Sequence, residues 1–197
     1  MSAPQSTLTY EGIMEMIHGI ALRQEETDRI VQESAEAVKE SAKQLKATQK
    51  ELGRFGNRIG EIVENMVRSN IAEKFRVYGY DVADEKCREK EFKNKNLGID
   101  GEIDLFLENG DIAILIEAKT TLETKDVRRH IRRMEEFRLY TDARGVDKRH
   151  FIGAVAGAVV EKEAKELAME KGLFVITQSG EFFEIVPPPE GFTAKKW

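Results

Sequence analysis

The chain has 197 residues, of which 31 are Lys or Arg and 36 are Asp or Glu, so its formal net charge is −5. This balance excludes an overall basic character that attracts nucleic acid, and any anion-binding face must be local. A single cysteine, Cys87, excludes an internal disulfide framework and suits a reducing compartment. We see neither a signal peptide nor an apolar run of about 20 residues, and we therefore expect a soluble, cytoplasmic protein without a membrane partner.

A heptad repeat begins at Tyr10 and continues without a break into the second third of the chain. Alternating steps of three and four residues connect the positions of a continuous heptad seam: Tyr10, Ile13, Ile17, Ile20, Gln24, Thr27, Val31, Ser34, Val38, Ser41, Leu45, Thr48, Leu52, Phe55, Ile59, Ile62 and Met66. A seam with a period of about 3.5 residues predicts a left-handed coiled coil. We expect residues 1–52 to form an oligomerisation arm, with homo-oligomer contacts over residues 1–66. The alternative is an amphipathic helix that folds back on its own domain.

Three glycines, Gly53, Gly56 and Gly60, mark the start of a second region. They lie near one side of a helix, off the heptad seam, and each lowers helix propensity. They indicate either a hinge or a helix surface pressed closely against a sheet. The apolar pattern continues to Phe75, which favours the second interpretation. We predict a domain over residues 53–189, whose first helix ends at 78–80, followed by a flexible tail over 190–197.

The segment Gly101–Thr120 reads as two strands joined at Asn109-Gly110, a pair typical of a type I′ hairpin turn with positive φ at both positions. Strict alternation then assigns the side chains to faces. In the first strand it separates the acidic Asp104 from an apolar face made of Ile99, Ile103, Leu105 and Leu107. In the second strand it places Glu117 and Lys119 opposite an apolar face made of Ile112, Ile114, Ile116 and Ala118. A carboxylate and an amine on a buried strand are costly unless they pair or meet a ligand.

The remaining elements are a helix after Thr120–Thr124, a buried strand over 151–160, a helix over 161–171, and strands over 173–177 and 182–186. The first of these helices carries basic residues that are candidates for nucleic-acid binding: Lys125, Arg128, Arg129, Arg132 and Arg133. The order of elements predicts an α/β fold with a mixed central sheet flanked by helices.

Asp104, Glu117 and Lys119 are the candidate catalytic residues. Two carboxylates on adjacent strands can share a hard divalent cation such as Mg²⁺ or Mn²⁺, which prefers oxygen ligands. A nearby ammonium can neutralise charge that develops on a phosphate oxygen. Metal-assisted hydrolysis of a phosphodiester needs these parts.

The pattern of an Asp in one strand and Glu-x-Lys at the end of the next resembles the signature of the PD-(D/E)XK nuclease superfamily. The residues GEIDL and IEAK are similar to the form found in Holliday-junction resolvase-like and RecB-like members. One departure is Ile103, where the signature has proline. The resemblance implies a restriction-endonuclease-like core of order α-β-β-β-α-β, preceded here by the long coiled-coil helix, and a Mg²⁺-dependent endonuclease that acts on DNA.

The resemblance also implies roles for individual residues. Asp104 and Glu117 are expected to bind the metal ion, together with the backbone carbonyl of Ala118. Lys119 is expected to position the attacking water or to stabilise the transition state, and Glu61 in the first helix to complete the metal shell. The alternative is a non-catalytic coiled-coil scaffold whose nuclease-like domain only binds DNA or a partner.

Overall fold

The computed structural model describes residues 9–82, 88–145 and 147–197, and Cys87 lies outside these ranges. The chain divides into two units, Met1–Phe55 and Gly56–Trp197. Helix α1 (Tyr10–Arg68) supplies most of the first unit and the beginning of the second. No helix among the described residues is long and apolar enough to cross a membrane.

In the first unit, α1 presents the apolar side chains of its heptad seam to solvent. Ile17, Val31, Val38 and Leu45 are between 55% and 68% exposed. Exposed aliphatic side chains at this spacing are unusual on a helix that needs no partner. From Tyr10 to Phe55, the seam residues are exposed in the part of the chain that the structure describes, and the coiled coil stays a prediction.

The end of the first helix differs from the prediction in two respects. Within the second unit, a Cβ atom built on Gly56 or Gly60 meets no described atom within 4 Å outside its own helix backbone, so the predicted close approach of these glycines to a sheet is wrong. The helix also stops at Arg68 rather than at 78–80, because Asn70 adopts a left-handed conformation with φ 62°. Asparagine tolerates that conformation better than most residues. A second, short helix α2 (Ile71–Val77) follows.

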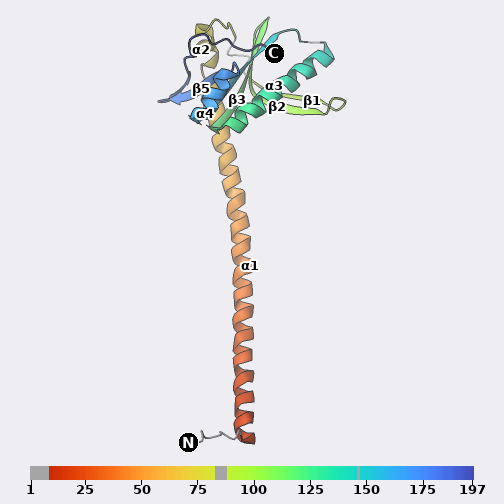
Figure 1. The fold of residues 1–197 in the computed structure, drawn as a ribbon, viewed down its shortest axis with the longest axis vertical. Helices are drawn as coiled ribbons and strands as arrows, with labels where there is room; N and C mark the ends of the chain where they lie inside the picture. The colour runs from red at the N-terminus through yellow and green to blue at the C-terminus, as the bar shows by residue number, and fades with distance from the viewer. Residues whose placement is uncertain (1–8, 83–87, 146) are drawn as a thin grey trace, which may run out of the picture. The chain divides into compact units, whose positions relative to one another are not determined.

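The second unit is an α/β domain built on one mixed sheet (Figure 1). Its elements are β1 (Arg88–Asn94), β2 (Ile99–Glu108), β3 (Ile112–Leu122), α3 (Thr124–Arg144), β4 (His150–Val160), α4 (Lys162–Glu170), β5 (Phe174–Ser179) and β6 (Phe182–Ile185). The six strands lie in chain order. β3, β4 and β5 are parallel, because α3 and α4 connect them, and the pairs β1–β2, β2–β3 and β5–β6 are antiparallel. The α/β fold with a mixed, helix-flanked sheet is therefore confirmed.

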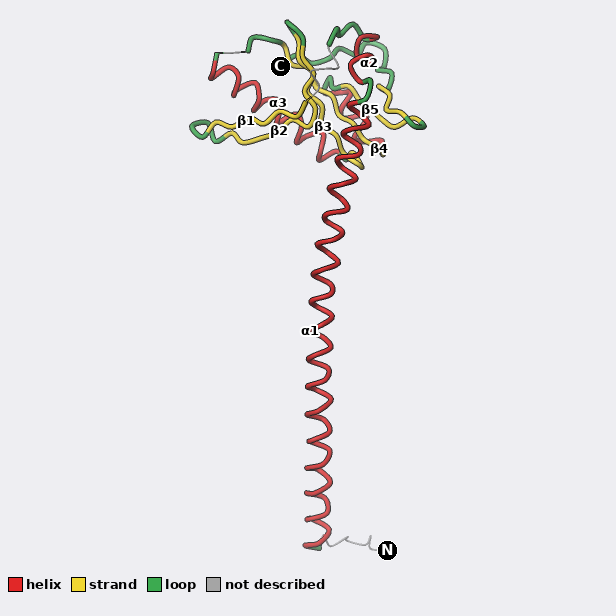
Figure 2. Tube along the Cα trace, turned by 180° about the vertical axis from the view of Figure 1, so that it is seen from behind, coloured by secondary structure: helices red, strands yellow, loops and turns green. Residues whose placement is uncertain are grey.

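Apolar side chains bury both faces of this sheet. On one face, Val67 of α1 and Phe75 of α2 pack against the strands. On the other face, Met134 and Phe137 of α3 pack on β2, β3 and β4, and Ala164 of α4 packs beside them. Figure 2 shows α3 along the sheet, and β1 and β2 as a hairpin that projects from it. The central strands are thus covered twice, as parallel strands usually are.

A β-bulge interrupts β2 beside Asp104. On β1, Arg88 and Lys90 are two residues apart, but their partners on β2, Phe106 and Ile103, are three apart. One extra residue therefore lies within 104–105. Ile103 and Phe106 consequently share the α3 face, and Leu105 lies on the other face. The predicted single apolar face of this strand is wrong, because strict alternation does not survive a bulge.

The hairpin between β2 and β3 is confirmed, but its turn is not type I′. Neither Asn109 nor Gly110 has a positive φ. The side-chain oxygen of Asn109 instead accepts hydrogen bonds from the backbone N–H groups of Asp111 at 3.0 Å and Ile112 at 2.8 Å. The turn is held by this asparagine side chain rather than by a left-handed backbone.

The C-terminal residues are ordered against the sheet, in contrast to the flexible tail expected over 190–197. Phe151 and Trp197 exchange two backbone hydrogen bonds, of 3.2 and 3.0 Å, and Lys196 forms an antiparallel bridge with Ile152. The backbone N–H of Lys195 also donates to the carbonyl of Gly172. The end of the chain thus contacts β4 and the turn that follows α4.

Candidate active site

Asp104 lies where β2 parts from β3. The antiparallel ladder runs from Glu108 and Ala113 to Leu105 and Ile116 and stops there. At the next position, Oδ2 of Asp104 accepts a hydrogen bond from the backbone N–H of Ala118 at 2.9 Å. The carboxylate of Asp104 thus accepts the hydrogen bond that a backbone carbonyl of β2 would accept if the ladder continued. The bulge directs that carboxylate toward β3.

Glu117 and Lys119 project together from β3, as the alternation in this strand predicts. Glu117 is only 1% exposed, and its Oε1 lies 2.8 Å from Nζ of Lys119. The pairing offsets part of the cost of burying the carboxylate. The β3 neighbour Ala118 faces the opposite core with Ile114 and Ile116, which confirms the predicted faces of this strand.

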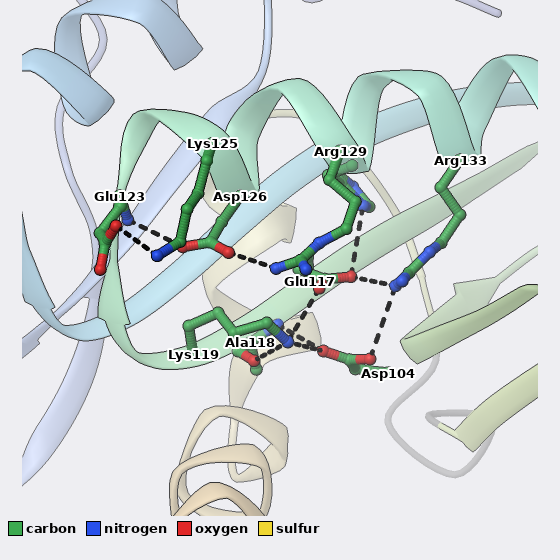
Figure 3. Close-up of polar contacts among 10 residues, drawn as sticks. Asp104, Glu117, Ala118, Lys119, Glu123, Lys125, Asp126, Arg129 and Arg133 are labelled. Atoms are coloured by element: carbon green, nitrogen blue, oxygen red, sulfur yellow. Dashed lines mark hydrogen bonds and ion pairs between the residues drawn. The ribbon is translucent and has the colours of Figure 1, made fainter.

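Three oxygen atoms surround the ammonium group of Lys119 (Figure 3). They are Oε1 of Glu117 at 2.8 Å, the carbonyl oxygen of Ala118 at 3.0 Å and Oδ2 of Asp104 at 3.4 Å. Burial lowers the pKa of Lys119, but the two carboxylates outweigh it and raise the pKa above its ordinary value. The ammonium group is therefore a cation held by three oxygen acceptors.

Arg133 of α3 approaches the same carboxylates from the other side. Its Nη1 donates to Oε2 of Glu117 and lies 3.9 Å from Oδ1 of Asp104. This arginine was a candidate for nucleic-acid binding from its sequence alone, and the structure pairs it with the two acids. Asp104 nevertheless has a raised pKa, first because it is buried and second because of the negative charge of Glu117. The site therefore retains an attraction for positive charge.

His130 completes the buried side of the site and was missed by the sequence analysis. It is fully buried, and its Nε2 lies 3.1 Å from the carbonyl oxygen of Leu115, an acceptor that requires Nε2 to carry the proton. Nδ1 lies 3.8 Å from Oε2 of Glu117 and has no hydrogen-bond partner among the described residues. Burial lowers the pKa of His130 to about 4, so the ring is neutral at pH 7.

The carboxylate of α1 on which the charge of Asp104 acts is Glu64, not the predicted Glu61. Glu61 is exposed, whereas Glu64 is partly buried. Burial, and then the charge of Asp104, raise the pKa of Glu64, and Lys119 lowers it. At about 100° per residue, Glu64 is adjacent to the buried Val63 and Glu61 is turned away from it. The burial of Val63 and Val67 shows which side of α1 faces the domain, and this side carries Glu64 rather than Glu61.

The other basic residues of α3 divide into two groups. Lys125 pairs with Glu123, and Arg129 pairs with Asp126. Arg128 and Arg132 are exposed and form no ion pair within the part of the chain that the structure describes. These two arginines are spaced by four residues and therefore lie on one side of the helix. Of the five candidates for nucleic-acid binding, they are the ones whose charges have no ion-pair partner among residues 9–82, 88–145 and 147–197.

The donor set around Lys119 is suited to Mg²⁺ or Mn²⁺. It consists of two carboxylate oxygens and a backbone carbonyl oxygen, the hard ligands that these cations prefer. Among the described residues, no three His, Cys, Asp or Glu side chains are grouped as a metal site. The backbone carbonyl of Ala118 is thus needed as a third ligand, with Glu64 as a nearby further carboxylate.

Comparisons with protein-family models, with curated proteins and with solved structures find no match for this chain. The geometry of the site is therefore the basis for assigning a function.

Proposed function

We propose that this protein is a metal-dependent DNA endonuclease with a PD-(D/E)XK site. The convergence of Asp104, Glu117 and the Ala118 carbonyl on the Lys119 ammonium carries the proposal. The chain order of helix, three antiparallel strands, helix and parallel strand agrees with the restriction-endonuclease-like core that the sequence resembles. A structural ion pair does not require a third oxygen from the backbone.

Each group has a defined task in this proposal. Asp104, Glu117 and the Ala118 carbonyl hold the cation, and Glu64 adds negative charge beside them. When bound, Mg²⁺ or Mn²⁺ polarises a phosphate oxygen and makes a bound water more acidic. Lys119 stabilises the negative charge that develops on the phosphate oxygens. Arg133 pairs with the buried Glu117 and orients its carboxylate, and Arg128 and Arg132 contact the DNA backbone.

Cleavage of DNA by the purified full-length protein tests the proposal. Supercoiled, linear, single-stranded and branched DNA are incubated with Mg²⁺ or Mn²⁺ and, in parallel, with EDTA. We expect cleavage of at least one substrate with metal and none with EDTA. A protein that cuts no substrate under any of these conditions is not the proposed enzyme.

A pair of helix variants tests the assignment of Glu64. Glu64→Ala is expected to lower the cleavage rate about tenfold to a hundredfold, the usual effect of losing a residue that supports a metal site. Glu61→Ala is the matched control and is expected to keep the wild-type rate, because its side chain is exposed. Initial rates at saturating Mg²⁺ are compared. Equal rates for the two variants, or a loss only in Glu61→Ala, contradict the assignment.

The second candidate function is a non-catalytic scaffold. The exposed heptad seam of α1 favours it, since this seam is suited to association with further copies of the chain. We propose homo-oligomer formation through residues 1–66 in either case. The two functions are distinguished by the metal response: a scaffold is not stabilised by Mg²⁺ or Mn²⁺, whereas the enzyme is.

Two neighbouring substitutions test the association. Val38 lies on the heptad seam, and Lys39 lies beside it, off the seam; both are exposed. Val38→Glu is expected to shift the protein toward the monomer, because a charge then lies in an apolar layer. Lys39→Glu is expected to sediment like the wild type. Analytical ultracentrifugation at several concentrations measures both, and wild-type behaviour of Val38→Glu contradicts the proposed interface.

A further inference from the structure

The Lys119 ammonium lies among the oxygens that the proposed function assigns to a metal ion. Its Nζ is 2.8 Å from Oε1 of Glu117, 3.0 Å from the Ala118 carbonyl and 3.4 Å from Oδ2 of Asp104. We infer that Lys119 occupies the cation position of this site in the metal-free protein, and that a divalent cation takes this position by displacing it. The inference rests on the proposed function, because it concerns the same site.

The two cations of the site are not equivalent. Each carboxylate turns one oxygen toward Lys119 and the other toward Arg133, as Figure 3 shows. Of these two cations, Lys119 is the one that hydrogen-bonds with the backbone oxygen of Ala118 in the part of the chain that the structure describes. A metal ion that uses the Ala118 carbonyl therefore competes with the ammonium for its ligands. Arg133 can keep its contact with Oε2 of Glu117 throughout.

The site allows this exchange without rearrangement of the core. The Lys119 side chain is 32% exposed, whereas that of Glu117 is 1% exposed. Lysine is a compact charge on a flexible stem, so its ammonium can move into solvent while β3 stays in place. A metal ion and the Lys119 ammonium bound to the same oxygen atoms would lie so close together that their positive charges repel strongly. Occupation by the metal and by Lys119 is therefore mutually exclusive.

Displacement of Lys119 by the metal ion makes the lysine available to a substrate only after the metal has bound. In the metal-free protein, Lys119 and Arg133 balance the charges of Asp104 and Glu117, and the ammonium is not available to a substrate. When a divalent cation takes its place, the ammonium is released beside the site. The ammonium of Lys119 can therefore reach a bound phosphate only in the metal-bound protein.

A matched pair of variants tests the inference through metal affinity. Lys119→Met and Arg133→Met each remove one positive charge from the same two carboxylates. The dissociation constant for Mn²⁺ is measured by electron paramagnetic resonance of the free ion. We expect Lys119→Met to bind Mn²⁺ about tenfold more tightly than the wild type, or about 1.4 kcal/mol, and more tightly than Arg133→Met. Asp104→Asn is the control for binding at this site and is expected to weaken it.

The outcomes separate this inference from the proposed function. Equal gains in Lys119→Met and Arg133→Met indicate an effect of net charge alone and overturn the inference. No gain in Lys119→Met, with Mn²⁺ binding in the wild type that Asp104→Asn abolishes, overturns it and leaves the metal site standing. Absence of Mn²⁺ binding in the wild type and all variants overturns both.

A measurement on the wild type avoids any dependence on how the variants fold. The rate at which an acylating reagent modifies Lys119 is measured by mass spectrometry with and without Mg²⁺, with the 70% exposed Lys125 as the internal reference. We expect Mg²⁺ to raise the modification of Lys119 several-fold relative to Lys125. An unchanged or lower ratio in a protein that binds the metal overturns the inference.

Discussion

Replacing Glu117 by glutamine is expected to lower metal-dependent DNA cleavage by a factor on the order of 10³, which corresponds to about 4 kcal/mol of transition-state stabilisation. Glutamine keeps the shape of the buried side chain but removes the negative charge that pairs with Lys119 and Arg133. It also removes one of the carboxylates assigned to the cation. Initial cleavage rates at saturating Mg²⁺, on the substrate that the wild type cuts best, measure the effect.

The control for this experiment is Glu166→Gln, a change of the same chemistry on the exposed surface of α4. It is expected to keep the wild-type rate. The melting temperature of Glu117→Gln shows whether the variant is folded, so that a loss of activity is not a loss of structure. A folded Glu117→Gln that retains more than about a tenth of the wild-type rate is inconsistent with a metal-binding carboxylate.

Replacing Phe137 by alanine is expected to lower the free energy of unfolding of the domain by about 3–5 kcal/mol. Phe137 is 1% exposed. Its ring centroid lies 5.0 Å from that of Phe151, 5.1 Å from that of Phe92 and 5.7 Å from that of Phe106. The ring therefore attaches α3 to β1, β2 and β4, and alanine leaves a cavity among these aromatic side chains. Unfolding in urea, followed by circular dichroism, measures the change.

Leu139→Ala provides the matched control on the same helix. Leu139 is 58% exposed, and its truncation is expected to change the free energy of unfolding by less than about 0.5 kcal/mol. Similar stabilities of the two variants contradict the packing described for α3.

Much of the fold follows from local sequence patterns. The alternation in β3 correctly places Glu117 and Lys119 on one face and Ile114, Ile116 and Ala118 on the other. Side-chain direction in a regular strand depends only on position along the chain. The hairpin at Asn109, the α/β order and the long helix are equally local in origin. These patterns are sufficient to bring Asp104 and Glu117 to adjacent strands.

Other features depend on contacts between segments that are distant in the sequence. The bulge in β2 shifts the alternation at Asp104, and it arises from the pairing of β1 with β2 rather than from a residue typical of bulges. Glu64, rather than Glu61, is assigned to the site only because Val63 and Val67 are buried against the sheet. Asn70 ends α1 by its left-handed backbone conformation, although the apolar pattern continues beyond it.

Hairpin register and strand periodicity are local properties, so the amino-acid sequence was sufficient to identify the pair of strands and the three motif residues. The other groups that face these three residues depend instead on how α3 packs on the sheet. Arg133 and His130 lie on a helix whose basic pattern resembles a solvated surface, and packing of Phe137 and Met134 turns these two residues inward to Glu117. The charge balance of the site, and the position of Lys119 among three oxygens, follow from that packing.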